Sequence, residues 1–298
     1  MSEVTQRCRN CQTMVTGEYC NQCGQREGRA DQRFRDLAGE LLGDVFDMDS
    51  RFWRTLFFLL FRPGFLSAEF IAGRRARYLP PLRLYLVISF VVFLVMSFAA
   101  SYAIDSDGGV VVQGADDVVV AADDAASDTP GDESEDTDDG LAEIDLADEN
   151  SPQWLKDLDE RAETNVVKIK DDPREFIEAM VSYLPQMMFL LLPVFALLVQ
   201  FAYLFSSFHY LQHLVFSLHY HSFVYLLFLL AQAIELLQVH VDGWLMIALF
   251  VYLPLAFRKT YGSGWRGAVG KSIFVYLSYA VTLMMGFAGV AVLALMLL

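Results

Sequence analysis

The sequence predicts an all-α membrane protein: a bundle of about five transmembrane helices, with interfacial amphipathic helices and a small cysteine ribbon before it. Three observations predict this fold class. Hydrophobic residues make up 55% of the 298 residues, which is too apolar for an ordinary soluble domain. All four cysteines lie in two C-x-x-C pairs near the N-terminus. Five apolar segments reach or approach the about 20 residues that cross a bilayer, namely 82–104, 183–205, 215–239, 243–257 and 272–298.

The cysteine pairs predict a structural zinc ribbon over residues 1–30, with Cys8, Cys11, Cys20 and Cys23 as ligands. Two thiolates two residues apart can ligate one tetrahedral ion from a single turn, and two such turns fill its four positions. Two disulfides are the alternative, but thiols stay reduced in the cytoplasm, where we place this end of the chain. A closed site leaves no position for catalysis. A protein partner at the ribbon stays open, whereas nucleic acid is not expected, because membrane phosphates are the nearer anions.

Residues 31–81 are expected to form amphipathic helices at the membrane surface. Apolar residues recur at helical spacing over 34–46, which predicts a helix that either packs on the ribbon or lies at the membrane surface. A second helix over 51–61 is too short to span, and Pro63-Gly64 ends it. A third short helix, over 66–72, stops at Gly73. Contacts with anionic lipid headgroups are predicted for the arginines Arg62, Arg74, Arg75, Arg77 and Arg83.

The distribution of charge predicts how the chain crosses the membrane. Residues 51–83, the elbow, carry seven arginines and one carboxylate immediately before the first span. Basic residues concentrate on the cytoplasmic side of spans, so the N-terminus is predicted to be cytoplasmic and the C-terminus extracytoplasmic. The expected location is the bacterial inner membrane. The bundle of the second to fifth spans occupies 183–298, and its basic loop, 258–271, is again predicted to face the cytoplasm.

The net charge of −15 comes from one segment. Residues 105–149 hold 17 carboxylates and no lysine or arginine. Residues 105–150 have too little apolar surface to fold and are predicted to be a disordered extracytoplasmic loop. Residues 151–182 then resume an apolar periodicity, which predicts short amphipathic helices that lead into the second span.

Four motifs carry a family resemblance: the CGQ that ends the ribbon, the RPG turn, GRRARYLPPLRLYL and HLVFSLHYHSF. Together they resemble an uncharacterised bacterial family of zinc-ribbon, multi-pass membrane proteins, a domain of unknown function. The resemblance covers most of the chain except the acidic insert. It implies the architecture above and brings no activity.

Histidines near the start of the third span suggest a candidate second metal or polar site: His209, His213, His219 and His221. On one continuous helix His209 and His213 share a face, His219 points away, and His221 lies about 12 Å beyond His213 at ~1.5 Å per residue. One ion cannot bind both, since ligand bonds are near 2 Å. We favour hydrogen bonds to backbone, lipid or neighbouring helices.

A polar stripe on the same span is a candidate transport path: Ser217, His221, Tyr225, Gln232 and Glu235. Polar groups within a bilayer usually face protein or water. Glu235 is the only carboxylate within a predicted span, so a cation or proton path is one interpretation. Hydrogen bonding between helices, with Glu235 at the outer interface, is the other.

No catalytic motif of the GxSxG, P-loop, dinucleotide-binding or HExxH kind occurs. The sequence therefore favours a non-enzymatic membrane adaptor or scaffold, with homo-oligomers left open. The alternatives are a channel or transporter that uses the polar stripe, and a membrane metalloenzyme that uses the histidines.

Overall fold

The computed structural model describes residues 6–25, 50–106, 152–153, 156, 164–166, 173–236 and 242–297. The predicted helix over 34–46 and nearly all of the predicted acidic loop lie outside the described residues. The chain forms two compact units. The larger comprises Met1–Leu94 with Met188–Met285, and the smaller comprises Val95–Met187 with Gly286–Leu298.

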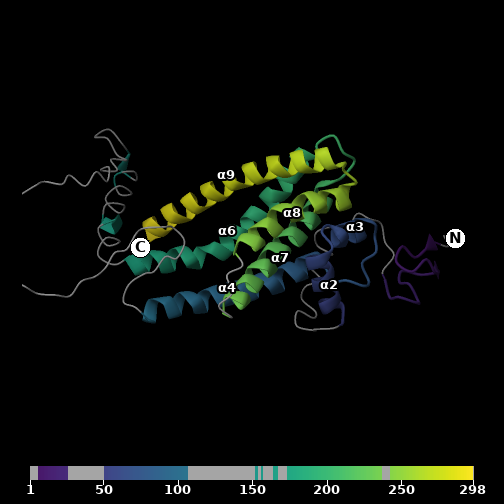
Figure 1. Ribbon diagram of the computed structural model, residues 1–298, viewed down its shortest axis with the longest axis horizontal. Helices are drawn as coiled ribbons and strands as arrows, with labels where there is room; N and C mark the ends of the chain where they lie inside the picture. Colours follow the sequence, from purple (N-terminus) through teal and green to yellow (C-terminus); the bar gives the residue numbers. More distant parts are fainter. Residues whose placement is uncertain are drawn as a thin grey trace, which may run out of the picture. The chain divides into compact units, whose positions relative to one another are not determined.

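The described residues are mostly helical (Figure 1). Two short helices, α2 (Ser50–Phe61) and α3 (Phe65–Ile71), precede the long helices, and their bounds agree with the predicted pair to within one residue. The long helices are α4 (Pro81–Ser106), α6 (Pro173–Ala202), α7 (Tyr210–Glu235), α8 (Asp242–Tyr261) and α9 (Trp265–Leu297). Two short antiparallel strands, β1 (Gln6–Arg7) and β2 (Met14–Val15), belong to the N-terminal ribbon.

Five helices are long and apolar enough to cross a membrane, as predicted. Their bounds differ from the predicted ones at several ends. α7 begins five residues before the predicted 215, and α9 begins at Trp265 rather than at 272, so part of the predicted basic loop 258–271 is helical. α6 begins at Pro173, so the last part of the predicted 151–182 segment continues directly into the second span. α8 runs through Pro254 to Tyr261, past the predicted end at 257. The helix continues through Arg258 and Lys259, because basic side chains in the last turn interact favourably with the negative end of the helix dipole. Their long side chains can also reach the polar membrane surface.

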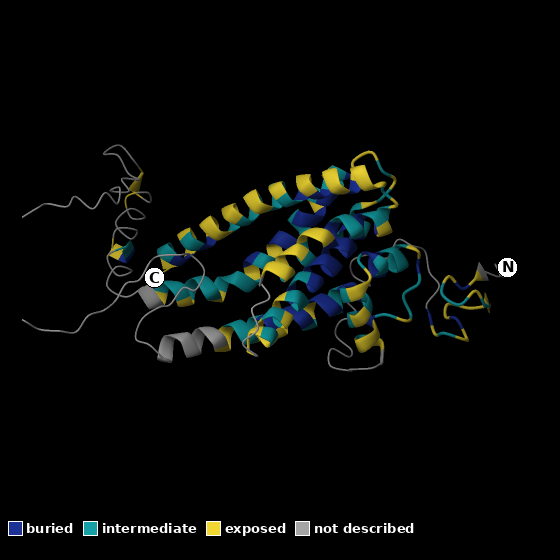
Figure 2. Cartoon of the chain, in the orientation of Figure 1, coloured by how far each residue is buried: buried dark blue, intermediate teal, exposed yellow. Residues whose placement is uncertain are grey.

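α7 forms the core of the larger unit. Its buried run from Val215 to Phe223 stands out in Figure 2. α7 contacts α2, α3 and α8, and α3 also contacts α8. α9 instead keeps exposed apolar residues, such as Leu277 and Met284, along its length. An apolar exposed face on a helix of this length is what lipid contact requires.

The turn Arg62-Pro63-Gly64, within the elbow, packs against α8. Proline has no N–H, so the Leu59 carbonyl lacks the donor that would continue α2. The hydroxyl of Tyr252 on α8 donates to this carbonyl over 2.9 Å. Gly64 has a positive φ of 72° and accepts a 3.1 Å hydrogen bond at its carbonyl from the Thr260 hydroxyl. The missing helical donor is therefore supplied by the neighbouring helix.

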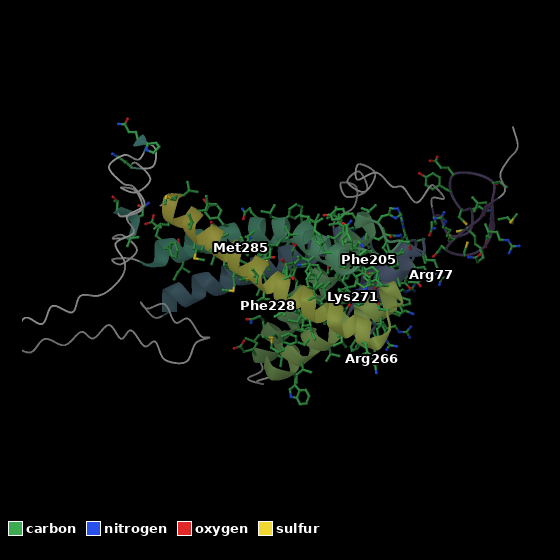
Figure 3. The ribbon with its side chains drawn as sticks, turned by 90° about the horizontal axis from the view of Figure 1, so that it is seen from above. Arg77, Phe205, Phe228, Arg266, Lys271 and Met285 are labelled. Carbon is green, nitrogen blue, oxygen red and sulfur yellow. The ribbon has the colours of Figure 1, made fainter. Side chains whose placement is uncertain are left out.

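The segments predicted to face the cytoplasm meet at one end of the larger unit. Gly64 of the elbow contacts Thr260 on α8. His213, at the start of α7, lies with Nδ1 2.9 Å from the Tyr261 hydroxyl at the end of α8. Arg77 and Arg266 both lie toward this end (Figure 3). The elbow, the start of α7 and the end of α8 are therefore neighbours at one end of the larger unit.

In the smaller unit, Asn165 is 5% exposed, and its side-chain amide donates to the Leu295 carbonyl near the end of α9 over 2.8 Å. Helix C-terminal carbonyls lack partners within the helix. This bond satisfies one of them.

Candidate metal centre and arginine-lined cavity

The two C-x-x-C pairs fold into two turns with the same backbone hydrogen bonds. The Cys8 amide donates to the Thr13 carbonyl, and the Gln12 amide donates to the Cys8 carbonyl. The second turn repeats this pattern, from the Cys20 amide to the Gln25 carbonyl and from the Gly24 amide to the Cys20 carbonyl. The residue after each pair, Gln12 or Gly24, has a positive φ of 65° or 69°. Each turn thereby presents its two thiols on one side.

The four sulfur atoms lie within 4.8 Å of one another, so these cysteines could hold a metal ion. Cys8 Sγ is 3.5 Å from Cys23 Sγ, and Cys11 Sγ is 3.4 Å from Cys20 Sγ. None of the four cysteines forms a disulfide, and these distances exceed the about 2.05 Å of an S–S bond. They approach the ~3.8 Å edge of a sulfur tetrahedron around zinc, given Zn–S bonds of about 2.3 Å. The four thiols therefore fit one tetrahedral ion better than two disulfides.

Cys11 is the thiol whose acidity the ribbon changes most clearly. Hydrogen bonding with the Thr13 side chain, and then with the Thr13 backbone, lowers the pKa of Cys11 to about 6. Cys11 Sγ lies 3.4 Å from Thr13 Oγ1. The thiolate is the form that ligates metals. At neutral pH Cys11 is therefore mostly in the thiolate form that ligates metals.

Gln25, directly after the second turn, attaches the ribbon to the elbow. Its side-chain amide donates to the Gly73 carbonyl over 2.8 Å. Its carbonyl oxygen accepts from the Arg75 and Ala76 amides over 3.2 and 3.4 Å. Gln25 is 9% exposed. One buried side chain thus makes three hydrogen bonds to the elbow.

A cavity of about 560 Å³ lies where the ribbon meets the elbow. Its wall is formed by the ribbon, α2, α3, the loop that follows α3, the start of α4 and, through His219, the first half of α7. Its polar side chains include four arginines, Arg51, Arg74, Arg75 and Arg83, together with Gln25 and His219. No carboxylate is among the described residues that line it.

The guanidinium groups are held by neighbours in different ways. Arg74 donates to both carboxylate oxygens of Glu69, and the bond from Nε is 2.6 Å long. This pairing raises the pKa of Arg74 further above its already high value. The guanidinium carbon of Arg75 lies 4.1 Å from the centre of the Phe70 ring, a cation–π contact. Both side chains are thereby held in place by residues of α3.

The structure separates the five predicted headgroup arginines into two groups. Arg74, Arg75 and Arg83 line the cavity. Arg62 lies over the Phe58 ring at 5.2 Å, and Arg77 is exposed on the loop after α3. Arg51, which the sequence analysis did not select, joins the cavity group.

The four histidines of the predicted second site have separate partners. His209 precedes α7, and its amide donates to the Gln212 side chain over 2.9 Å, which places it outside the helix assumed in the sequence analysis. His213 meets Tyr261, and His219 Nδ1 is 3.0 Å from Ser67 Oγ. His221 Nε2 is 2.9 Å from the Tyr279 hydroxyl. Among the described residues, only the four cysteines form a group of three or more potential metal ligands.

The predicted polar stripe divides at the middle of α7. Ser217, His221 and Tyr225 are buried, and the Ser217 hydroxyl donates to the Leu192 carbonyl of α6 over 2.9 Å. Gln232 and Glu235 are exposed, and Glu235 is the last residue of α7. The buried half of the stripe thus makes contacts between helices, and Glu235 reaches the helix end.

Sequence reasoning missed Gln25, Arg51 and Ser67 as site residues. Gln25 belongs to the CGQ motif, which was noted as a family feature without a role for the glutamine. Ser67 and Arg51 offered no signal, because a serine in a short helix and an arginine at a helix start are both common. Only contacts between distant segments identify them.

Residues 49–93 match the family described as "Protein of unknown function (DUF3667)". No curated protein and no solved structure matches the chain. The matched residues supply ten of the fifteen that line the cavity. The elbow of this chain is therefore similar to a family of unknown function.

Proposed function

We propose that the protein is a non-enzymatic integral protein of the bacterial inner membrane, in which a structural zinc ribbon acts as an adaptor at the cytoplasmic end of the helices. The observation that carries this proposal is the attachment of the ribbon to the elbow through Gln25. A ribbon that only folded a tail would not need three hydrogen bonds to the helical unit. Because the ribbon is attached, a partner that binds to the ribbon can change the conformation of the elbow.

Zinc is the proposed ion because it prefers four thiolates in a tetrahedron. The sulfur spacing and the low pKa of Cys11 support that ligand set. Four thiolates leave no open coordination position, so the role is structural. The metal supplies the stability that a ribbon of this size cannot obtain from a hydrophobic core.

A protein is the proposed partner of the ribbon. Met14 and Tyr19 are 50% and 58% exposed on it, and exposed apolar and aromatic side chains favour protein contacts. A cytoplasmic ribbon follows from the arginines of the elbow and the basic turn after α8, which lie at the same end of the larger unit. A transport role has less support, because Glu235 is exposed at the end of α7.

The test combines elemental analysis with hydrogen exchange on the purified full-length protein. We expect one zinc per chain, lost in the Cys8→Ser/Cys20→Ser variant. The Gln25→Ala variant should keep its zinc but exchange the Arg75 and Ala76 amides faster, because both donate to Gln25. A chain without zinc refutes the metal assignment. Unchanged exchange in Gln25→Ala refutes the attachment. The cytoplasmic position of the ribbon is tested separately, with topology reporters near residue 130 and at the N-terminus, which must report opposite compartments.

A further inference from the structure

The turn between α8 and α9 carries three cations that have no counter-charge among the described residues. Arg258 and Lys259 lie in the last turn of α8, and Arg266 is the second residue of α9. None of these side chains forms an ion pair or a hydrogen bond with another described residue. We propose that this basic turn, residues 258–266, binds the headgroup of an anionic phospholipid.

The ring of Trp265 holds one of these cations in position. The guanidinium carbon of Arg258 lies 3.9 Å from the centre of the ring, a cation–π contact. The Nε atom of Arg258 is buried and has no hydrogen-bond partner in the described structure. The ring therefore fixes the guanidinium without neutralising its charge. Trp265 is itself exposed, and tryptophan is enriched at the level of lipid headgroups.

An exposed apolar stripe continues from Arg266 along α9 (Figure 2). Its first members, Val269, Ile273 and Leu277, lie three, seven and eleven residues after Arg266, on the same face of the helix. At about 1.5 Å per residue, the distance along the axis from Arg266 to Leu277 is roughly 17 Å. One leaflet contributes about 15 Å of the hydrocarbon core. The stripe therefore has the length of the acyl chains of one leaflet.

The helix surface is open where the basic turn meets the stripe. Gly270 lies on the same face, one turn after Arg266, and a Cβ at this position would have no atom within 4 Å. A ligand can therefore approach the backbone of α9 beside the cations. A phospholipid carries its negative phosphate at one end and apolar chains at the other, so it matches both the turn and the stripe. A soluble phosphate would use the cations alone.

The experiment measures lipid binding by the full-length protein in detergent. Phosphatidylglycerol and phosphatidylcholine are titrated separately, and native mass spectrometry counts the lipids that each chain retains. Phosphatidylglycerol should bind more tightly, because its headgroup has a net negative charge. Inorganic phosphate at the same ionic strength then serves as a competitor, and it should leave phosphatidylglycerol bound because it cannot contact the stripe. Displacement by phosphate would identify a simple anion site and refute a lipid site.

A matched pair of double variants locates the site. Arg258→Gln/Arg266→Gln removes two charges from the basic turn, and Arg7→Gln/Arg54→Gln removes two from the ribbon and α2. Each cation beside an anionic headgroup strengthens binding by about fivefold, so the affinity for phosphatidylglycerol should fall by about 25-fold in the first variant. The second should change it by at most about twofold, because exposed charges outside the turn are screened.

Arg266→Gln alone gives an independent measure if the first double variant does not fold. Arg266 is exposed and has no partner to lose among the described residues, so this variant should fold and lose about fivefold in affinity. Equal losses in the two double variants would mean that only the net charge of the protein attracts the lipid. That result, or equal affinities for the two lipids, would overturn the proposal.

The inference goes beyond the adaptor role and does not depend on it. Zinc analysis of the same preparations tests that role separately, and none of the substituted residues is a cysteine. Every variant should therefore keep its metal. A chain that contains zinc and binds both lipids equally refutes the lipid site alone, whereas a chain that lacks zinc and prefers phosphatidylglycerol refutes the metal assignment alone.

Discussion

Replacing Gly64 by alanine should destabilise the larger unit severely, and the structure shows why. Gly64 is buried, with a φ of 72°. A Cβ there would lie 2.4 Å from the Ala256 carbonyl oxygen, 2.8 Å from the Ala256 Cα and 2.8 Å from Thr260 Oγ1. Two of these atoms belong to the backbone of α8, which cannot turn aside as a flexible side chain would. The RPG turn must therefore move away from α8.

The expected cost has two parts. The left-handed conformation costs an alanine about 1–2 kcal/mol. Forcing a methyl group into a packed contact adds about 1–3 kcal/mol. Gly262→Ala is the matched control, because Gly262 has a φ of 67° but nothing within 4 Å of its Cβ position. Gly262→Ala should show only the first cost and Gly64→Ala both.

The free energies of unfolding can be compared by reversible unfolding in bicelles or by steric trapping. We expect Gly64→Ala to lose about 1–3 kcal/mol more than Gly262→Ala. Equal losses in the two variants would refute the close packing of the RPG turn on α8. A loss in Gly262→Ala alone would contradict the argument as a whole.

Three further results follow from the structure. Tyr252→Phe removes the donor to the Leu59 carbonyl and should cost about 1–3 kcal/mol; thermal unfolding in detergent measures it, and no change would mean that another group supplies the donor. The ribbon should keep its metal down to about pH 6, because protonation of Cys11 removes a ligand, and Thr13→Val should raise the pH at which metal is lost, since Thr13 lowers the pKa of Cys11; elemental analysis after dialysis at stepped pH measures this. Because the pKa in the folded ribbon, about 6, lies below the ordinary 9.0, this contribution to stability is complete above pH 9 and lost below pH 6. Chelation of the metal should open the ribbon to protease while the long helices stay protected, and equal protection before and after chelation would show that the ribbon folds without metal.

The sequence by itself determined the spans, the paired cysteines and the short helices of the elbow. These features depend on local properties: apolar length, the spacing of two thiols, and the helix end that Pro63-Gly64 imposes. They could be predicted because each needs only residues that are neighbours in the chain. The fourth span was predicted to end at 257, but α8 continues to Tyr261. A proline is expected to break a helix, yet neighbouring helices can satisfy the backbone groups that Pro254 frees, so the helix continues through it.

Only the tertiary structure decided which arginines share a cavity and what holds the ribbon. Arg75 and Arg77 are two residues apart, yet one lines the cavity and the other is exposed. Gln25 reaches Gly73, and Ser67 reaches His219, across large separations in sequence. Such contacts depend on how α3 and the ribbon pack, which no local pattern encodes. The physical reason is that a hydrogen bond or a cavity wall requires proximity in space, whereas helix and turn signals require only proximity in sequence.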